Sequence, residues 1–283
     1  MGVRRAVDTV EGILDGTKSG AVYTMGPLIH NPVVLEGLKK KGLSVLDDEN
    51  IELAGLGDTV VIRAHGVAPA VYEKLKKQEC TVIDATCPRV KVSQKRASEY
   101  AAKGYTIILT GDKNHGEVTG ISGFAGKNFL LLQNFAEAQK LFGQLDNKQI
   151  PEKAVLLSQT TYSPEEFEKI ASLIKQKIPE LEIFNTICSA TRDRQSALVR
   201  LAVIADGILV IGGRNSANTQ RLYSNALALC KKAALIETAD EIPEEYFKME
   251  TVGITAGAST PDELIKSVEE KLNRQNCTKN GSC

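Results

Sequence analysis

The chain has 283 residues, a length that predicts two domains, or three if they are small. Its 42% apolar and 25% charged residues are typical of globular proteins and exclude a disordered or collagen-like chain. Lys plus Arg and Asp plus Glu each number 35, so the formal net charge is zero and no overall basic field would attract nucleic acid or an anionic membrane. An anionic ligand must therefore be held locally.

No stretch is long and apolar enough to span a bilayer, because the best candidate, Leu201 to Gly213, is short and contains Asp206. The first residues lack the apolar segment of a signal peptide. We therefore expect no membrane partner, no nucleic-acid partner and a cytoplasmic location. In that compartment the six cysteines are expected to be buried thiols, catalytic groups or metal ligands rather than disulfides.

Short runs rich in Val and Ile alternate with amphipathic stretches of helix length, which is the pattern of βα units around parallel sheets. Strands are predicted at residues 21–23, 60–62, 81–83, 106–109, 155–157, 208–211 and 252–254. Three helices are predicted to begin where a capping residue or a proline opens them: at Pro88, at Ser163-Pro164 and at Thr260-Pro261. The predicted fold class is α/β.

An internal repeat relates two of the cysteines. Each follows an apolar run and opens a predicted helix, and in both copies a strand-ending glycine comes 24 residues after the cysteine, with a polar residue four positions further on. The equivalent positions are Cys87 and Cys188, Gly111 and Gly212, and His115 and Ser216.

A third copy is expected upstream, formed by residues 2–7, a strand at 21–26 and the loop residue His30. Its cysteine would fall just before Met1. Each copy also has a second strand that ends in a polar loop before a proline-started helix. The sequence therefore predicts three pseudo-equivalent α/β units with small, mostly parallel sheets, at 1–86, 87–184 and 185–275, and a disordered tail at 276–283.

Several polar residues follow strands, at the carboxyl ends where parallel sheets bind ligands. All three histidines are among them: His30, His65 and His115. One loop histidine is usually a satisfied surface residue, but three of three favour a shared function. Neutral donors at predicted helix N-termini complete the set: Thr160, Ser216, Asn218 and Ser259. Helix capping needs the same residue types, so only their convergence would indicate a phosphate pocket without lysine.

Cys87 and Cys188 stand at predicted helix N-termini, where a thiolate is stabilised. Each alone could equally be a small buried apolar residue, but their equivalence in the repeat favours metal ligation. Three cysteines from three equivalent units could hold an iron-sulfur cluster with one iron free of cysteine. The remaining cysteines are expected to be structural or at the surface: Cys80, Cys230, Cys277 and Cys283.

Glu117 opens a predicted helix two residues after His115. It is either an acid stabilised by the helix dipole or a proton carrier beside the open iron. In the second case we expect His115 and Thr160 to lie within hydrogen-bond reach of it.

Seven segments resemble the 4-hydroxy-3-methylbut-2-enyl diphosphate reductase family, also called the LytB/IspH family, from Gly2 to about Leu272. They are residues 30–31, 64–67, 84–88, 115–118, 159–161, 215–219 and 255–259, and include Asp84-Ala85-Thr86-Cys87-Pro88 and His115-Gly116-Glu117-Val118. The resemblance implies a trefoil of three α/β units around a 4Fe-4S cluster. The cluster would supply electrons to remove the substrate's hydroxyl, giving isopentenyl and dimethylallyl diphosphates in the methylerythritol phosphate route to isoprenoids.

The same resemblance implies roles for single residues. Cys87 and Cys188 would be cluster ligands, and Glu117 would deliver a proton. Substrate binding would fall to His30, His65, His115, Thr160, Ser216, Asn218 and Ser259. The electron donor would be a ferredoxin or a flavodoxin.

This sequence differs from the family pattern in two places. The pattern Gly-Phe-Cys-x-Gly-Val puts Met1 at x, so the third cluster ligand is expected upstream of Met1. Ala217 stands where many members have Ser, which leaves a backbone N–H but no side-chain donor there.

Two other functions, and an inactive truncated reductase, remain alternatives. A non-redox module would bind a diphosphate ester with structural cysteines, and Cys87→Ser would leave its affinity unchanged. A cysteine hydrolase using Cys87 with His65 is less favoured, because it leaves the equivalence of Cys87 and Cys188 unexplained.

Overall fold

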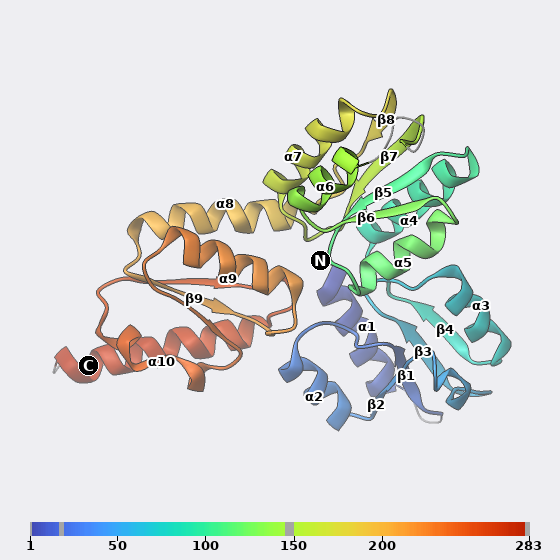
Figure 1. The fold of residues 1–283 in the computed structure, drawn as a ribbon. Helices are drawn as coiled ribbons and strands as arrows, with labels where there is room; N and C mark the ends of the chain where they lie inside the picture. Colours follow the sequence, from blue (N-terminus) through green and yellow to red (C-terminus); the bar gives the residue numbers. More distant parts are fainter. Residues whose placement is uncertain (1, 17–19, 145–149, 281–283) are drawn as a thin grey trace. The chain divides into compact units, whose positions relative to one another are not determined.

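The computed structural model describes residues 2–16, 20–144 and 150–280, with side chains up to residue 274 (Figure 1). The chain divides into two compact units. Unit 1 comprises Met1–Ile29 and Leu38–Cys188, and unit 2 comprises His30–Gly37 and Ser189–Cys283. Among the described residues, unit 1 contains two parallel β-sheets and unit 2 contains one.

The first sheet of unit 1 has the strand order β2-β1-β3-β4, with every pair parallel. Its strands are β1 (Val22–Met25), β2 (Leu43–Leu46), β3 (Thr59–Ile62) and β4 (Thr81–Asp84). The connecting elements are α2 (Pro32–Lys40), the 3₁₀ helix η1 (Ile51–Leu53) and α3 (Pro69–Lys77). Leu75 of α3 is buried against Val60 and Ile62, and α1 (Gly2–Gly16) lies on the other side of this sheet (Figure 1).

The second sheet of unit 1 has the order β6-β5-β7-β8, again all parallel. Its strands are β5 (Thr106–Thr110), β6 (Phe129–Leu132), β7 (Lys153–Ser158) and β8 (Glu180–Ile183). Side chains alternate between its faces: Ile107 of β5 is buried under α4 (Pro88–Ala102) and α5 (Gly116–Ala125), whereas Ile108 is buried under α6 (Phe135–Gln144) and α7 (Pro164–Lys175). Helices therefore cover both faces, as expected for a parallel sheet.

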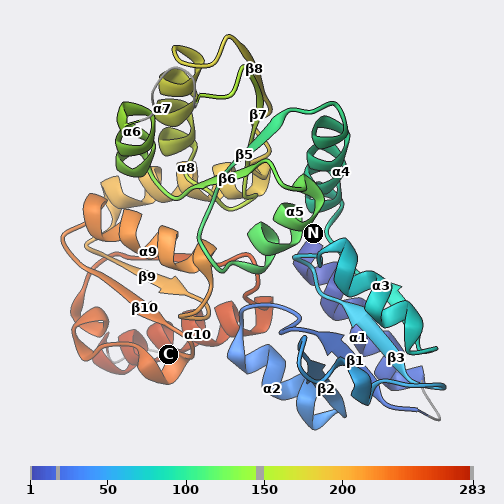
Figure 2. The same cartoon turned by 45° about the vertical axis from the view of Figure 1, so that its right-hand side comes forward.

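Unit 2 has a three-stranded parallel sheet of order β10-β9-β11. The strands are β9 (Gly207–Ile211), β10 (Ala233–Ile236) and β11 (Val252–Ala256). Helices α8 (Ser189–Ile204) and α9 (Ala217–Leu229) cover one face, and α10 (Asp262–Asn280) covers the other (Figures 1 and 2). Two 3₁₀ helices, η2 (Ala239–Glu241) and η3 (Glu244–Lys248), join β10 to β11.

The three sheets share one arrangement, which confirms the α/β class and the repeat. In each sheet the first strand lies between the second and third strands of its copy. A glycine follows each first strand, and its backbone N–H donates to the last carbonyl of the neighbouring edge strand: Gly26 to Leu46 at 2.7 Å, Gly111 to Leu132 at 3.1 Å and Gly212 to Ile236 at 3.0 Å. The predicted divisions 1–86, 87–184 and 185–275 each contain one of these sheets, but as domain boundaries they stay predictions.

All seven predicted strands are present, and the sequence analysis missed four more: β2, β6, β8 and β10. Each missed strand lies at the edge of its sheet. Edge strands bury fewer side chains, so their apolar runs are interrupted; β8, for example, has one partly buried residue among four.

Two of the three predicted helix starts are confirmed, because α4 begins at Pro88 and α7 at Pro164, with the Ser163 hydroxyl accepting from the Glu166 N–H at 3.3 Å. The third prediction was early by one residue, since the helix was expected to begin at Pro261 and α10 begins at Asp262. The Thr260 hydroxyl donates to the carbonyl of Ile211 at 2.9 Å, so it holds the loop against the sheet instead of capping the helix.

The disordered tail predicted at 276–283 is also different in part, because α10 continues to Asn280. No Gly or Pro interrupts the chain between Pro261 and Gly281, so nothing in the sequence stops the helix earlier. Residues 281–283 lie outside the described residues. Within the described part of the chain, no helix has the length and apolarity that a membrane span requires.

Candidate functional site

Cys87 and Cys188 follow the fourth strands, β4 and β8, and the other predicted site residues lie in loops that follow the first and third strands of each sheet, or at the helix starts after them. The chain leaves these two strands in opposite directions across the sheet, and such a reversal point is where open parallel sheets bind ligands. Unit 1 holds His65, Cys87, His115, Glu117, Thr160 and Cys188. Unit 2 holds His30, Ser216, Asn218 and Ser259.

Glu117 and Thr160 form the tightest polar contact among these residues. The Glu117 side chain is 1% exposed, in the first turn of α5. One carboxylate oxygen accepts from the Thr160 backbone N–H and the other from the Thr160 hydroxyl, both at 2.7 Å. The expected hydrogen-bond reach between them is confirmed, and the contact joins the loops after β5 and β7.

His115 is the N-cap of α5, so the alternative of helix capping is real for this residue. Its Nδ1 accepts from the Glu117 backbone N–H at 3.2 Å. A neutral imidazole that accepts at Nδ1 carries its proton at Nε2, which makes that nitrogen a donor. The His65 and His115 rings meet edge to face with their centroids 5.1 Å apart. Within unit 1, the structure therefore brings His65 and His115 together beside Glu117.

Cys87 and Cys188 occupy equivalent places in the structure. Cys87 is the N-cap of α4, and Cys188 directly precedes α8. Each backbone N–H donates to a carbonyl in the loop after the third strand of its sheet, from Cys87 to Ala64 at 2.9 Å and from Cys188 to Thr160 at 2.8 Å. The repeat thus fixes both cysteines by the same backbone contact.

The three residues before each cysteine form the same turn. The Asp84 side chain accepts from the Thr86 N–H at 2.9 Å, and the Asn185 side chain accepts from the Ile187 N–H at 3.2 Å. Such side-chain to backbone bonds stabilise a tight turn. Asp84 also pairs with Lys91 at 2.6 Å. Partial burial would raise the pKa of Asp84, but the hydrogen bonds from Lys91 and Thr86 and the charge of Lys91 hold it below its usual value.

The chemistry of this cysteine pair fits an iron-sulfur cluster. Both are free, partly buried thiols at helix starts, where thiolates are stabilised, and thiolates are the usual ligands of such clusters. Gly2, the first residue of α1, lies against Cys87: a Cβ at Gly2 would collide with the Cys87 Sγ. The start of the helix that opens the first copy is therefore packed on the cysteine of the second copy.

The other described cysteines have a different environment. Their thiols donate to carbonyls within the fold at 3.6 Å, from Cys80 to Leu75 and from Cys230 to Ala205. Burial raises the pKa of Cys80, which disfavours its thiolate. These contacts agree with a structural role. Cys277 and Cys283 lie outside the residues whose side chains are described.

In unit 2 the loops after β1 and β11 are joined around His30. The Ser259 hydroxyl donates to the His30 carbonyl at 3.5 Å, and the Asn31 side-chain amide donates to the Ser259 carbonyl at 3.1 Å. Gly213, after β9, approaches the same His30 carbonyl so closely that a Cβ would collide with it. The structure therefore brings two loops of the third sheet and the His30 segment together.

Ser216 and Asn218 begin α9. The Ser216 hydroxyl caps the helix by accepting from the Thr219 N–H at 3.3 Å. Asn218 is 5% exposed, and its Nδ2 is buried with no hydrogen-bond partner among the described residues. A buried donor without a partner is costly, so this amide indicates a ligand that accepts from it.

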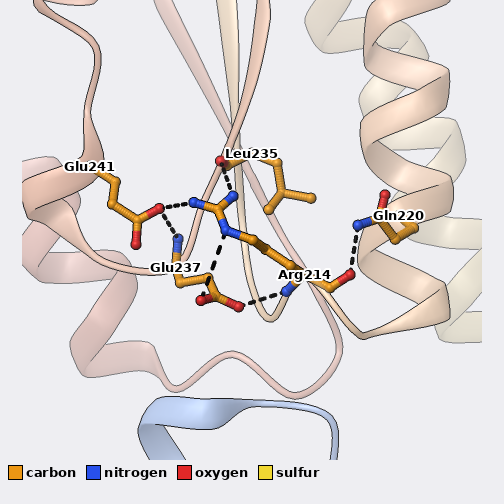
Figure 3. A network of polar contacts seen from close by, with 5 residues as sticks. All are labelled: Arg214, Gln220, Leu235, Glu237 and Glu241. Atoms are coloured by element: carbon orange, nitrogen blue, oxygen red, sulfur yellow. Dashed lines mark hydrogen bonds and ion pairs between the residues drawn. The ribbon is translucent and has the colours of Figure 1, made fainter.

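The sequence analysis missed Arg214, which anchors the loop before Ser216 (Figure 3). Its guanidinium pairs with Glu241 and donates to the Leu235 carbonyl at 3.2 Å, while its backbone N–H donates to Glu237 at 2.7 Å. Gln220 donates to the Arg214 carbonyl at 2.6 Å. These bonds tie the loop after β9 to the region after β10. Nothing in the sequence indicated that Arg214 pairs with Glu237 and Glu241, because charged residues are common in polar loops.

Gln159 has a similar role in unit 1 and was also not singled out. Its Nε2 donates to Asp112 at 3.1 Å and to Thr161 at 2.8 Å, and its Oε1 accepts from the Asp112 N–H at 2.8 Å. It thus joins the two loops that carry Glu117 and Thr160. A third missed residue, Arg63, lies directly after β3, and its place two residues before His65 was an available signal.

Comparisons with known proteins find relatives over nearly the whole chain. A family model described as LytB protein matches residues 1–273. The 4-hydroxy-3-methylbut-2-enyl diphosphate reductase of Treponema denticola is 49% identical over 276 residues, which cover 96% of this chain and 94% of that protein. The protein of that name from Caldanaerobacter subterraneus is 42% identical over 272 residues, covering 96% and 92%.

Two solved structures are similar as well. One is (E)-4-hydroxy-3-methyl-but-2-enyl diphosphate reductase, described as the terminal enzyme of the non-mevalonate pathway, with 37% identity, a TM-score of 0.70 and coverage of 97% of this chain and 95% of that one. The other is the E-1-hydroxy-2-methyl-but-2-enyl-4-diphosphate reductase of Plasmodium falciparum, with 30% identity, a TM-score of 0.85 and coverage of 96% and 83%.

Proposed function

Because this chain belongs to the LytB family, we propose that it carries out the reaction for which its relatives are named, the reduction of 4-hydroxy-3-methylbut-2-enyl diphosphate. It is an oxidoreductase of isoprenoid synthesis. The observation in its own structure that carries the proposal is the repeated cysteine at a helix start, beside loops that hold a buried carboxylate.

Cys87 and Cys188 are the proposed ligands of a 4Fe-4S cluster. When bound, the cluster supplies electrons and an iron free of cysteine that acts as a Lewis acid. We assign the third ligand to the first copy of the repeat, at the position that its cysteine is expected to take just before Met1. The contact between Gly2 and the Cys87 thiol supports this assignment, because it brings the start of the first copy to the second copy's cysteine.

Glu117 is the proposed proton donor to the departing hydroxyl. Its buried carboxyl group is held at both oxygens by Thr160, so its position is fixed before substrate arrives. His115 is oriented by the bond from the Glu117 N–H to its Nδ1, which leaves Nε2 to donate. Thr160 and His115 thereby position and assist the same proton transfer.

The diphosphate is bound by histidines and by neutral donors at strand ends. In unit 1 we assign this role to His65, together with His115 and Thr160 as contacts to the substrate. In unit 2 we assign it to His30, Ser216, Asn218 and Ser259. The buried, unpartnered amide of Asn218 supports the assignment because a phosphate oxygen would accept from it.

The proposal extends to the surroundings of the enzyme. The electrons come from a ferredoxin or a flavodoxin, and the protein works in the cytoplasm. The cluster must pass two electrons to the substrate, and the proposal assigns the enzyme no second redox cofactor that could supply them. A low-potential electron-carrier protein is therefore the proposed source.

An anaerobic turnover assay tests the function. The chain, expressed with any residues that its gene encodes ahead of Met1, is reconstituted with iron and sulfide and mixed with a reduced low-potential donor and the substrate. We expect isopentenyl and dimethylallyl diphosphates to form only when donor and cluster are both present. If the iron-loaded protein binds the substrate but forms neither product, the non-redox binding module is the better account.

A further inference from the structure

Arg63 carries a partly buried positive charge at the end of β3, in the same loop as His65. Two glycines from other loops make room for it. A Cβ at Gly26 would lie 2.6 Å from the Arg63 Nη1, and a Cβ at Gly116 would lie 2.6 Å from its Nη2. The guanidinium therefore lies between the loop after β1 and the start of α5, next to the residues that follow His115.

This charge has no counter-ion in the described part of the chain. The Arg63 Nε is fully buried without a hydrogen-bond partner, and no carboxylate of a described residue forms an ion pair with the side chain. Burial lowers the pKa of Arg63, with a smaller opposing attraction from Asp48, but arginine remains charged in proteins. A buried N–H donor without a partner on a partly desolvated cation is unfavourable, so a partner that is not part of these residues is expected.

The groups around Arg63 also favour a bound anion. Gly116 is the first residue of α5, so the guanidinium lies at the positive end of that helix dipole. The His65 and His115 rings, which meet edge to face, belong to the same two loops. The Arg63 guanidinium and the N-terminus of α5 both supply positive potential here, and two imidazoles lie in the same loops. No described acidic group forms an ion pair with the arginine. This arrangement favours a bound anion.

We propose that Arg63 is a binding residue for the diphosphate group of the substrate, supplying the full positive charge that the histidines and neutral donors lack. The inference rests on the proposed function for the identity of the anion. It adds a cation to the expected phosphate pocket without lysine. Because the chain's net charge is zero and supplies no general attraction, Arg63 provides a local one.

Binding of inorganic diphosphate to the iron-loaded protein, measured by titration calorimetry, tests the proposal. Arg63→Met removes the charge and keeps a long side chain, and we expect its Kd to rise about tenfold or more. Arg63→Lys keeps the charge without the planar fork, so an intermediate Kd is expected. The exposed Arg200 provides a matched control: Arg200→Gln changes the net charge by a comparable amount and should bind like the wild type.

Turnover kinetics separate binding from folding and from the chemical step. In Arg63→Lys we expect KM to rise with little change in kcat, and wild-type KM to rise with added salt more steeply than that of Arg63→Met. If Arg63→Met does not fold, Arg63→Gln replaces it as the neutral variant in both measurements. Wild-type affinity in Arg63→Met, or a Kd in folded Arg63→Lys as high as in Arg63→Met, would overturn the proposal. A wild type that binds diphosphate through Arg63 but makes no product would overturn the proposed function alone.

Discussion

The side chain of Glu117 is held in one orientation by a single neighbouring residue. Thr160 donates to both carboxylate oxygens, once from the backbone and once from the hydroxyl. The backbone N–H can only donate, whereas a hydroxyl can donate or accept. An amide in place of the carboxylate therefore keeps both contacts, with its oxygen on the N–H and its nitrogen on the hydroxyl.

This geometry makes Glu117→Gln an informative variant. We expect folding and substrate affinity to be retained, because both contacts survive, while kcat falls by about 10²-fold or more, because the amide has no proton to give. Anaerobic turnover and substrate titration measure the two effects. A turnover close to that of the wild type would remove Glu117 from the proton path.

Asp84 and Asn185 show that one turn can be made by two different residues. Both accept from the backbone N–H two residues ahead, one position before their cysteines. Only Asp84 adds an ion pair, with Lys91. The second copy thus indicates which part of the interaction the fold requires, namely the acceptor oxygen and not the charge.

Two variants separate these contributions. Asp84→Asn should keep the turn and cost little stability, because the lost ion pair is largely exposed. Asp84→Ala should cost more, about 1 kcal/mol, because the Thr86 N–H loses its acceptor. Denaturant unfolding measures both; equal losses would show that the charge, rather than the turn, matters.

The lowered pKa of Asp84 also predicts a pH dependence. A carboxyl group whose pKa is lower in the folded state stabilises the protein above its unfolded pKa of about 3.9 and loses that contribution as the pH falls through the folded value. The small stability difference between the wild type and Asp84→Asn should therefore be largest near neutral pH and shrink on acidification. A difference that grows in acid would contradict this sign.

At the scale of elements, central strands and most helix starts could be predicted, whereas four of the six edge strands could not. Strands in the middle of each sheet, such as β5 and β9, are almost fully buried and appear as unbroken Val and Ile runs. An edge strand such as β2 buries only its two end residues, so its sequence resembles a loop. At the site, residues at strand ends and helix starts were predicted, while partners supplied by other loops, such as Arg214, were not.

Helix α1 offers a test at this scale, because two of its three glycines have opposite surroundings. A Cβ at Gly2 would collide with the Cys87 thiol, whereas a Cβ at Gly12 meets nothing within 4 Å. Gly2→Ala should therefore displace the helix start from Cys87 and lower the iron retained by the protein. Gly12→Ala should retain iron and raise the free energy of unfolding by about 0.5 to 1 kcal/mol.

Iron analysis and thermal unfolding distinguish the two variants. If both retain iron equally, the contact between α1 and Cys87 has no role at the cluster. If Gly12→Ala is destabilising, the helix is not continuous through that residue, contrary to its assignment as Gly2–Gly16.

For the whole molecule, the repeat carried more information than any single motif. Three sheets share a strand order and a glycine that closes the first strand. The positions that kept register in the sequence are those at which the fold fixes a cysteine or a polar group. Contacts among those groups, such as the place of Arg63 between Gly26 and Gly116, depend on loops distant in sequence and required the structure.

The central claim is that the two repeated cysteines make this chain an iron-sulfur reductase. The most direct test is iron and acid-labile sulfide content after anaerobic reconstitution, with any residues encoded ahead of Met1 included. We predict about four of each per chain in the wild type and in Cys80→Ser, whose thiol is equally accessible but only donates to a carbonyl, and a large loss in Cys87→Ser and Cys188→Ser. An iron-free wild type, or full iron in both Cys87→Ser and Cys188→Ser, would contradict the account.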